Sequence, residues 1–324
     1  MKLSIRKTIG FFALLTVGVY LFAPRRILTV LPTPRIPGME EGKKITLNGQ
    51  DIYYEVGGAG PPVVFIHGIG GGNSGYQWIK NVPEFLAGHR VYVLDLPGFG
   101  RSMARPQHYS AGLYVAAIEA FLKEVVHEPC TVVASSLAGA YAIKIAHDSP
   151  DLIKKLALVS PTGIDQLIDP PNMAFYHQLI GSPIGSLFSL LIRSRLSVSY
   201  FLNQQVYLDR DLINEGIKDV YHMHLQLPHA QYPIFAFITG HLNLNIKKEW
   251  ENLTQPTVVV WGARDINTPV KGLQNFKDLK PELESQVLYA RAIPNDEKSV
   301  EFNGFLKQFL GDPTGEDVLT PNHN

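Results

Sequence analysis

The chain has 324 residues, of which 45% are hydrophobic, and its 29 Lys and Arg residues balance its 29 Asp and Glu residues. This composition predicts a packed globular core and excludes a disordered polymer, and the balanced charge argues against nucleic acid as a partner. Cys130 is the only cysteine, so an intrachain disulfide is excluded and a cysteine-based metal or redox site is not expected.

The N-terminus carries the first predicted element, an apolar run of about 16 residues at 8–23 with Lys and Arg on both flanks. The run is shorter than the roughly 20 residues of a straight transmembrane helix, but local thinning of the bilayer and snorkelling of the flanking cations would accommodate it. We interpret residues 1–36 as a single-pass membrane anchor followed by a Pro-rich connector. A cleaved signal peptide is the main alternative and a buried helix the other, although no small-x-small cleavage pattern follows the run. The flanking charges leave the side of the membrane open.

Residues 37–324 are predicted to form one α/β domain that begins with a hairpin. Asn48-Gly49 lies between two alternating segments, and both residue types tolerate the positive φ that a tight hairpin turn needs. Continuous apolar runs then alternate with helical stretches, which indicates a mostly parallel sheet with helices on both faces. The predicted strands are "PVVFIHG", "RVYVLDLPG", "CTVVASS", "KKLALVSP", "PTVVVWG" and "SQVLYA".

A long segment at about residues 165–250 interrupts this alternation. Its roughly 90 residues lack strand character and are rich in Leu, Ile, Phe, Tyr and His. A plain connection in an α/β unit is far shorter, so we predict an inserted helical cap. The stretch "IGSLFSLLIRSRLSVSYFL" within it is either packed on the sheet domain or part of a lid that contacts lipid.

Ser136 stands where a predicted strand runs directly into a helix, in "TVVASSLAGAYA". A strand-to-helix turn this sharp strains the backbone and requires small residues two positions away on each side, here Ala134 and Ala138. The turn also places the serine oxygen at a helix N-terminus, where free N–H groups favour an anionic intermediate. Taken alone, a serine at this place is equally consistent with a simple helix cap.

Two further segments support a catalytic role for Ser136. In "VVFIHGIGGG" a strand ends at His67-Gly68, and the backbone N–H of Ile69, together with that of Leu137, would form an oxyanion hole. Downstream, Asp265 follows the strand in "PTVVVWGARDINTP", a position from which an acid orients a base.

With these motifs in order, residues 43–311 resemble the α/β-hydrolases of the esterase, lipase and haloperoxidase-like group. The resemblance implies an α/β-hydrolase fold with an inserted cap, and it identifies "DLPGFGRS" as a structural loop. By the same resemblance, His67 is a loop histidine and not the catalytic one. The implied active-site residues are Ser136 as nucleophile, Asp265 as acid, and Ile69 and Leu137 as oxyanion donors.

The catalytic histidine of the family is missing from its expected place. The family pattern "G-H-x-P-x-x-E" precedes the last helix, and "R-A-I-P-N-D-E-K" matches it through Pro294 and Glu297, which leaves Ala292 at the histidine position. No histidine lies between His241 and His323. Loss of a triad member typically costs a factor of ~10⁴ or more, so the substitution affects the centre of the mechanism.

Three hypotheses account for this substitution. A histidine of the cap supplies the base, or the protein binds a ligand without turning it over, or the oxyanion hole serves a chemistry other than acyl transfer. On a helix, residues two apart point to different faces, so His222 and His224 do not indicate a metal site. We expect neither a metal nor a cofactor. The candidate bases are His222, His224, His229 and His241.

The sequence therefore predicts a membrane-associated serine hydrolase with an amphiphilic or apolar ester as substrate. The alternative is a catalytically impaired protein of the same fold that binds an apolar small molecule or a membrane partner. The expected partners are a small-molecule or lipid-like substrate and the membrane.

Overall fold

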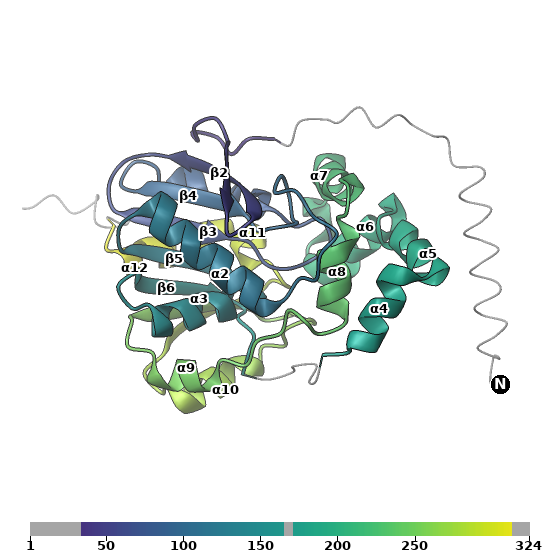
Figure 1. Ribbon diagram of the computed structural model, residues 1–324. Helices are drawn as coiled ribbons and strands as arrows, with labels where there is room; N and C mark the ends of the chain where they lie inside the picture. Colours follow the sequence, from purple (N-terminus) through teal and green to yellow (C-terminus); the bar gives the residue numbers. More distant parts are fainter. Residues whose placement is uncertain (1–33, 165–170, 313–324) are drawn as a thin grey trace, which may run out of the picture.

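A computed structural model describes residues 34–164 and 171–312 (Figure 1). Eight strands form one sheet in the order β1-β2-β4-β3-β5-β6-β7-β8. The pairs β1–β2 and β2–β4 are antiparallel, and every other pair is parallel. The strands are β1 (Lys43–Leu47), β2 (Gln50–Gly57), β3 (Pro62–Ile66), β4 (Arg90–Asp95), β5 (Cys130–Ser135), β6 (Ile153–Val159), β7 (Thr257–Gly262) and β8 (Glu284–Leu288).

The six apolar runs predicted as strands correspond to β3 through β8. Strands β3 and β5 are buried along their whole length, as expected for strands covered on both faces. The predicted hairpin joins β1 to β2, with φ of 49° at Asn48 and 74° at Gly49. The prediction of a mostly parallel sheet that begins with a hairpin is therefore confirmed.

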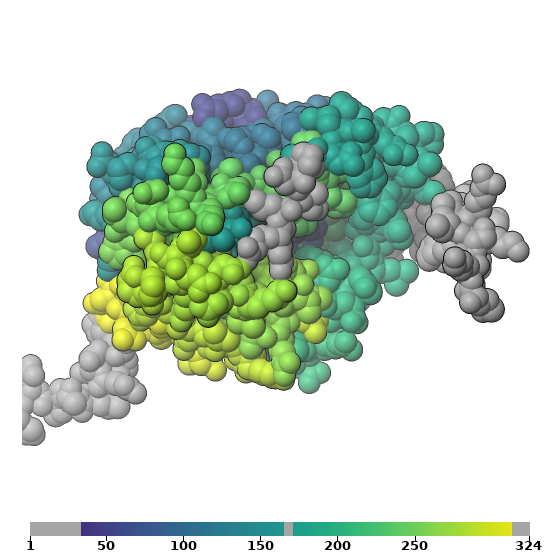
Figure 2. Space-filling view, turned by 90° about the horizontal axis from the view of Figure 1, so that it is seen from below, coloured from purple at the N-terminus to yellow at the C-terminus, as the bar shows by residue number. Residues whose placement is uncertain are grey.

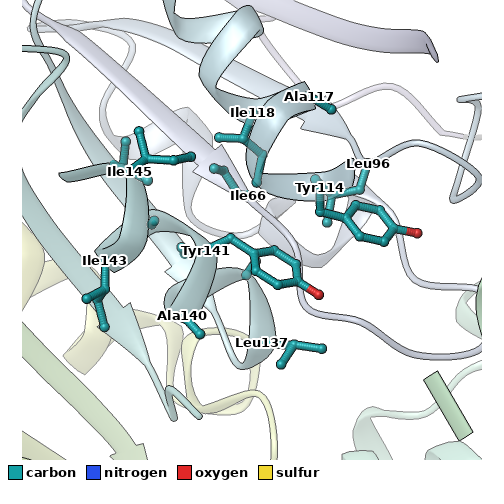
Figure 3. Close-up of a cluster of buried hydrophobic side chains, with 14 of the residues drawn as sticks. Ile66, Leu96, Tyr114, Ala117, Ile118, Leu137, Ala140, Tyr141, Ile143 and Ile145 are labelled. Atoms are coloured by element: carbon teal, nitrogen blue, oxygen red, sulfur yellow. The ribbon is translucent and has the colours of Figure 1, made fainter. Parts of the chain in front are cut away.

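One face of the sheet is covered by α2 (Ala111–Phe121) and α3 (Leu137–Asp148), with α9 (Lys247–Asn252) and α10 (Gly272–Leu279) beyond them. Figure 3 shows the rings of Tyr114 and Tyr141 side by side in this layer, and their planes differ by only 2°. The Tyr141 hydroxyl donates to the carbonyl oxygen of Leu242 at 2.7 Å. This bond ties α3 to the segment that returns from the cap. A short π-helical turn, η3 (Leu122–Val126), extends α2.

The opposite face is covered by α12 (Ser299–Leu310) together with two short 3-10 helices, η1 (Gly75–Trp78) and η2 (Val82–Glu84). Trp78 and Phe302 pack here against the strand side chains that alternate with those of the first face. The short helix α11 (Pro294–Glu297) precedes α12. The sheet is thus buried between two helical layers.

The predicted cap is helical and stands at one side of the sheet domain, as Figures 1 and 2 show. It has a small core of its own, which includes Leu202, Tyr221 and Ile234 and also takes in Ile293 from the loop after β8. Contact with that loop places the cap over one end of the sheet. The described elements of the cap are α4 (Met173–Gly181), α5 (Pro183–Ile192), α6 (Arg195–Phe201), η4 (Leu202–Val206), η5 (Arg210–Leu212), α7 (Glu215–Gln226) and α8 (Gln231–Ile238).

The predicted anchor at residues 8–23 lies outside the described residues. Within residues 34–164 and 171–312, no helix combines the length and the apolarity needed to cross a bilayer. Ile36, which we assigned to the connector, is only 2% exposed and packs against the sheet domain. Contacts of the globular domain therefore begin slightly before residue 37.

Candidate active site

Ser136 occupies a strained turn between β5 and α3. Its backbone has φ of 54° and ψ of −123°, which side-chain-bearing residues rarely adopt and which costs on the order of 1–3 kcal/mol. Ala134 and Ala138, two positions away on each side, are fully buried, so a larger side chain there would have to displace its neighbours. The Ser136 N–H donates to the carbonyl oxygen of Val159 at 2.7 Å, and this bond helps to hold the turn. The local structure predicted from the small flanking residues is present.

The loop after β3 passes close to Ser136. A Cβ placed on Gly68 would lie 3.5 Å from the Cβ of Ser136, an ordinary van der Waals contact, and 3.3 Å from the Ser135 hydroxyl oxygen, which is tight. Ile69 follows in the wall of a cavity that Ser136 also lines. Within the described chain, the backbone N–H groups of Ile69 and Leu137 donate to no backbone or side-chain acceptor. Both remain available for a developing oxyanion.

Asp265 lies in the loop after β7 and is 6% exposed. One carboxylate oxygen accepts from the backbone N–H groups of Asn267 at 2.9 Å and Thr268 at 3.0 Å. The other accepts from the Thr268 hydroxyl at 2.5 Å. Burial raises the pKa of the Asp265 carboxyl, and the hydrogen bonds from Thr268 and Asn267 oppose that rise. The carboxylate is held in one orientation without a histidine.

Ala292 lies in the loop that follows β8. The structure places Ser136, Asp265 and Ala292 in the wall of the same cavity. The Ala292 N–H donates to the carbonyl oxygen of Val206 in the cap at 3.1 Å. The neighbouring Arg291 donates its guanidinium to the carbonyl oxygen of Gln204 at 2.7 Å and does not line this cavity. Arg291 therefore does not take the place of an imidazole.

Contacts that do not involve the Ala292 side chain fix the loop around it. The Glu297 carboxylate accepts from the backbone N–H of Arg291 at 2.7 Å and from that of Leu208 at 2.8 Å. Asp296 accepts from the Tyr207 hydroxyl at 2.7 Å and also pairs with Lys80. The loop backbone is thus set independently of the residue at position 292.

The cavity has a volume of about 430 Å³ and lies between the sheet domain and the cap. Its walls are mainly apolar. Several of the lining residues belong to the cap, including Ile192, Leu225 and Phe237. Among its described lining residues, Asp265 is the only charged side chain and no histidine is present. Such a cavity accommodates an apolar ligand with a reactive group beside Ser136.

The two most buried histidines have structural roles. His67 bonds to the carbonyl oxygen of Gly68 at 2.7 Å, and its other ring nitrogen accepts from the Leu96 N–H at 3.0 Å. Both ring nitrogens of His67 are thus bonded to backbone groups, as expected for a histidine that holds a loop. His224 is 4% exposed and bonds through Nδ1 to the carbonyl oxygen of Gly72 at 3.1 Å. Burial lowers the pKa of both imidazoles. His224 does not line the cavity.

The other three candidate bases also lie outside the wall of the cavity that Ser136 lines. His222 is half-buried on α7, and His229 is exposed in the turn before α8. His241 bonds to the Thr239 hydroxyl at 2.9 Å, with its ring edge against His108. None of the three is among the residues that line the cavity. The structure therefore places none of the four candidate bases in the cavity wall with Ser136.

Sequence reasoning missed three polar residues of the site. Thr268 holds the Asp265 carboxylate, and Asn73 and Gln77 flank Gly68 in the cavity wall. The signal for the last two was their spacing of four in "NSGYQW", directly after the glycine-rich loop.

Comparison with known proteins addresses the fold. Residues 61–184 match a family model described as "alpha/beta hydrolase fold". The chain also resembles the crystal structure of a membrane phospholipase A, described as a bacterial virulence factor, with a TM-score of 0.71 and 20% identity over 95% of this chain and 98% of the other. The chain has the α/β-hydrolase fold. A thermophilic esterase from Thermogutta terrifontis has a TM-score of 0.68 and 18% identity over 84% of this chain and 98% of the other.

Relatives by sequence cover less of the chain than these structures do, at slightly higher identity. The dihydrolipoyllysine-residue acetyltransferase component of an acetoin cleaving system from Cupriavidus necator is 25% identical over 80% of this chain and 66% of its own length. A 2-hydroxy-6-oxononadienedioate/2-hydroxy-6-oxononatrienedioate hydrolase from Pseudomonas sp. is 24% identical over 69% of this chain and 78% of its own. Both acyltransferase and hydrolase names thus occur among the relatives of this α/β-hydrolase-fold chain.

Proposed function

We propose that the protein is a serine hydrolase for neutral, apolar carboxylic esters, with Ser136 as the nucleophile. The observation that supports this most is the strained backbone of Ser136, at the head of α3 and in the wall of a cavity that Asp265 shares. A simple helix cap needs no such conformation, because cap residues normally adopt an extended backbone. Strain of this kind is typical of a nucleophile that must be presented to a substrate.

The charge of the cavity supports a neutral substrate. The Pseudomonas relative is named for a dicarboxylate. In general, proteins bind carboxylates through Arg or Lys side chains. Among the described residues that line the cavity here, there is no Lys or Arg, and the one charged side chain is the carboxylate of Asp265. An anionic substrate would be repelled, whereas an uncharged ester with an apolar chain matches the apolar walls.

The proposed mechanism uses Asp265 as the base. The Ser136 oxygen attacks the ester carbonyl, and the negative charge forms on the carbonyl oxygen near the N–H groups of Ile69 and Leu137. The serine proton passes to a water molecule beside Ala292, which gives one of its own protons to the Asp265 carboxylate. Asp265 returns the proton through the same water to the departing alcohol, which leaves the acyl-serine. A second water then attacks the acyl-serine and gives a proton to Asp265, and Asp265 passes that proton to the Ser136 oxygen as the acid is released. Without imidazole, we expect turnover to be slow.

A fluorophosphonate that forms a covalent adduct with nucleophilic serines tests this proposal. We expect the reagent to label Ser136, because the strained turn exposes its hydroxyl to the cavity and oxyanion donors stand beside it. Mass spectrometry of the labelled peptide identifies the site. Labelling and esterase activity should be lost in Ser136→Ala and kept in Ser135→Ala, since Ser135 is 2% exposed at the end of β5. Activity that survives in Ser136→Ala would overturn the assignment.

A second candidate function is ligand binding without turnover. The substitution at Ala292 favours it, because no histidine among the described residues lines the cavity. Binding of an uncharged ester to wild type, together with no labelling of Ser136 and no hydrolysis, would make this the better account.

Association with a membrane is part of the proposed function. The apolar run at residues 8–23 supports it, and so does the cap, where large apolar side chains on α5 and α6 face solvent, among them Ile184, Leu191 and Leu196. We expect the full-length protein to fractionate with membranes. A variant that lacks residues 1–33, and so keeps the buried Ile36, should be recovered as a folded soluble domain. If expression of the full-length sequence yields soluble protein whose N-terminus has been cleaved near Pro24, the anchor is contradicted.

A further inference from the structure

The side-chain amides of Asn73 and Gln77 both hydrogen-bond to the backbone of Gly68, close to the proposed nucleophile. Gln77 Oε1 accepts from the Gly68 N–H at 3.0 Å, and Asn73 Nδ2 donates to the Gly68 carbonyl oxygen at 3.0 Å. The backbone partners fix the orientation of both amides, because an N–H needs an acceptor and a carbonyl needs a donor. A Cβ on Gly68 would be 3.3 Å from the Ser135 hydroxyl oxygen, which places the pair next to the turn that carries Ser136.

The other end of each amide has no protein partner. Gln77 Nε2 and Asn73 Oδ1 are both buried, and neither makes a hydrogen bond within the described chain. Gln77 as a whole is 4% exposed. Both residues line the cavity above Ser136. A buried polar atom without a partner is costly, so two of them on residues that line one cavity point to a ligand group that satisfies them.

The chemistry of this pair selects the ligand group. Gln77 offers a donor and Asn73 offers an acceptor, so the complementary group must both accept and donate. A carboxylate only accepts and would face the charge of Asp265, and an ammonium group only donates. A hydroxyl does both and carries no charge. Resting on the proposed function, the geometry points to a substrate that bears a free hydroxyl close to its ester carbonyl, recognised by Asn73 and Gln77.

The test measures binding and not turnover, so that it does not depend on the missing histidine. Isothermal titration calorimetry on the Ser136→Ala protein compares methyl octanoate with methyl 3-hydroxyoctanoate, whose hydroxyl is on the acyl side. It also compares ethyl octanoate with 2-hydroxyethyl octanoate, whose hydroxyl is on the alcohol side. We expect one hydroxylated ester to bind about tenfold more tightly than its parent, which converts to about 1.4 kcal/mol.

Variants then assign the preference to the two amides. In Gln77→Leu and in Asn73→Leu, each in the Ser136→Ala background, the ratio of the two dissociation constants should fall to about one while the parent ester still binds. Gln205→Leu is the matched control, because Gln205 also lines the cavity but is not among the residues with a buried unpartnered atom. Its ratio should stay near the starting value.

Each outcome decides between the proposals. If the parent esters bind and neither hydroxylated ester binds more tightly, the inference is wrong and the proposed substrate class stands. A preference that persists in both leucine variants also overturns it. If none of the four esters binds, the proposed ester substrate fails together with the inference. The comparison within the Ser136→Ala protein is decisive even if a leucine variant does not fold.

Discussion

Replacing Ala292 with histidine is expected to raise the rate of hydrolysis of a simple activated ester by at least ~10²-fold. The substitution places an imidazole in the cavity wall that Ser136 and Asp265 share. Asp265 would orient the ring, and the ring would take the serine proton directly. The gain is a modest share of the ~10⁴ that a complete triad supplies, because the loop is not shaped around the ring. Steady-state hydrolysis of 4-nitrophenyl butyrate by the two proteins measures it.

The matched control for this gain is Ala292→Asn, which adds a polar side chain that cannot accept a proton at neutral pH. Its rate should not rise above the wild-type level. Ser136→Ala combined with Ala292→His should be inactive. If Ala292→His folds, binds the ester and shows no gain, the position is not that of the missing base. If a single substitution of His222, His224, His229 or His241 abolishes activity in a variant that still folds and binds the ester, a cap histidine moves to Ser136 during catalysis and the proposed role of Asp265 is wrong.

Substituting Asp265 with asparagine should lower the hydrolysis rate of the wild-type chain by about 10²-fold or more, which is the usual contribution of a general base. Burial raises the pKa of Asp265, and only the ionised form accepts a proton. In wild type, kcat/KM should therefore fall as the pH drops through this raised pKa, and it should be level above it. Asp265→Asn should show no such step. Asp151→Asn, at an exposed carboxylate, serves as the control.

The same pKa predicts the direction of a stability change. A carboxyl whose pKa is higher in the folded chain than in the unfolded chain binds its proton more tightly when folded. Its contribution to stability is thus most favourable below the unfolded value, near 3.8, and declines as the pH rises to the folded value. At neutral pH, Asp265→Asn removes a buried charge, so the variant should melt no lower than wild type. A large loss of stability would indicate that Asp265 is mainly structural.

The strands were the part of the fold most accessible from sequence. Each predicted run is a short block of β-branched and apolar residues, and a strand buried on both faces requires such a block. The cap was harder. The stretch "IGSLFSLLIRSRLSVSYFL" reads as one apolar segment, but α5 ends at Ile192 and α6 begins at Arg195. The Ser194 hydroxyl accepts from the Ser197 N–H at 3.1 Å and caps α6, a signal that a hydrophobicity pattern does not register.

The site divides in a similar way. Ser136 and Asp265 follow strands of a parallel sheet, so topology alone brings them to the same edge. The cap histidines could not be placed from sequence, because the rotation of each helix depends on long-range packing. His224 bonds to Gly72, which lies more than a hundred residues earlier in the chain. The unpartnered amide atoms of Asn73 and Gln77 could not be predicted from sequence for the same reason, because the burial of a side chain depends on long-range packing.

The anchoring of the loop at position 292 has a practical consequence for protein engineering. Glu297 and Asp296 hold the backbone through contacts with the cap and with Lys80, and none of these contacts involves the side chain of residue 292. The backbone of the loop should therefore keep its conformation when the side chain at position 292 is changed. Histidine, methylated histidine or other imidazole analogues can be introduced there one at a time, against a fixed serine and a fixed carboxylate. In this protein, the pKa of an introduced base could be varied while the rest of the site stays constant.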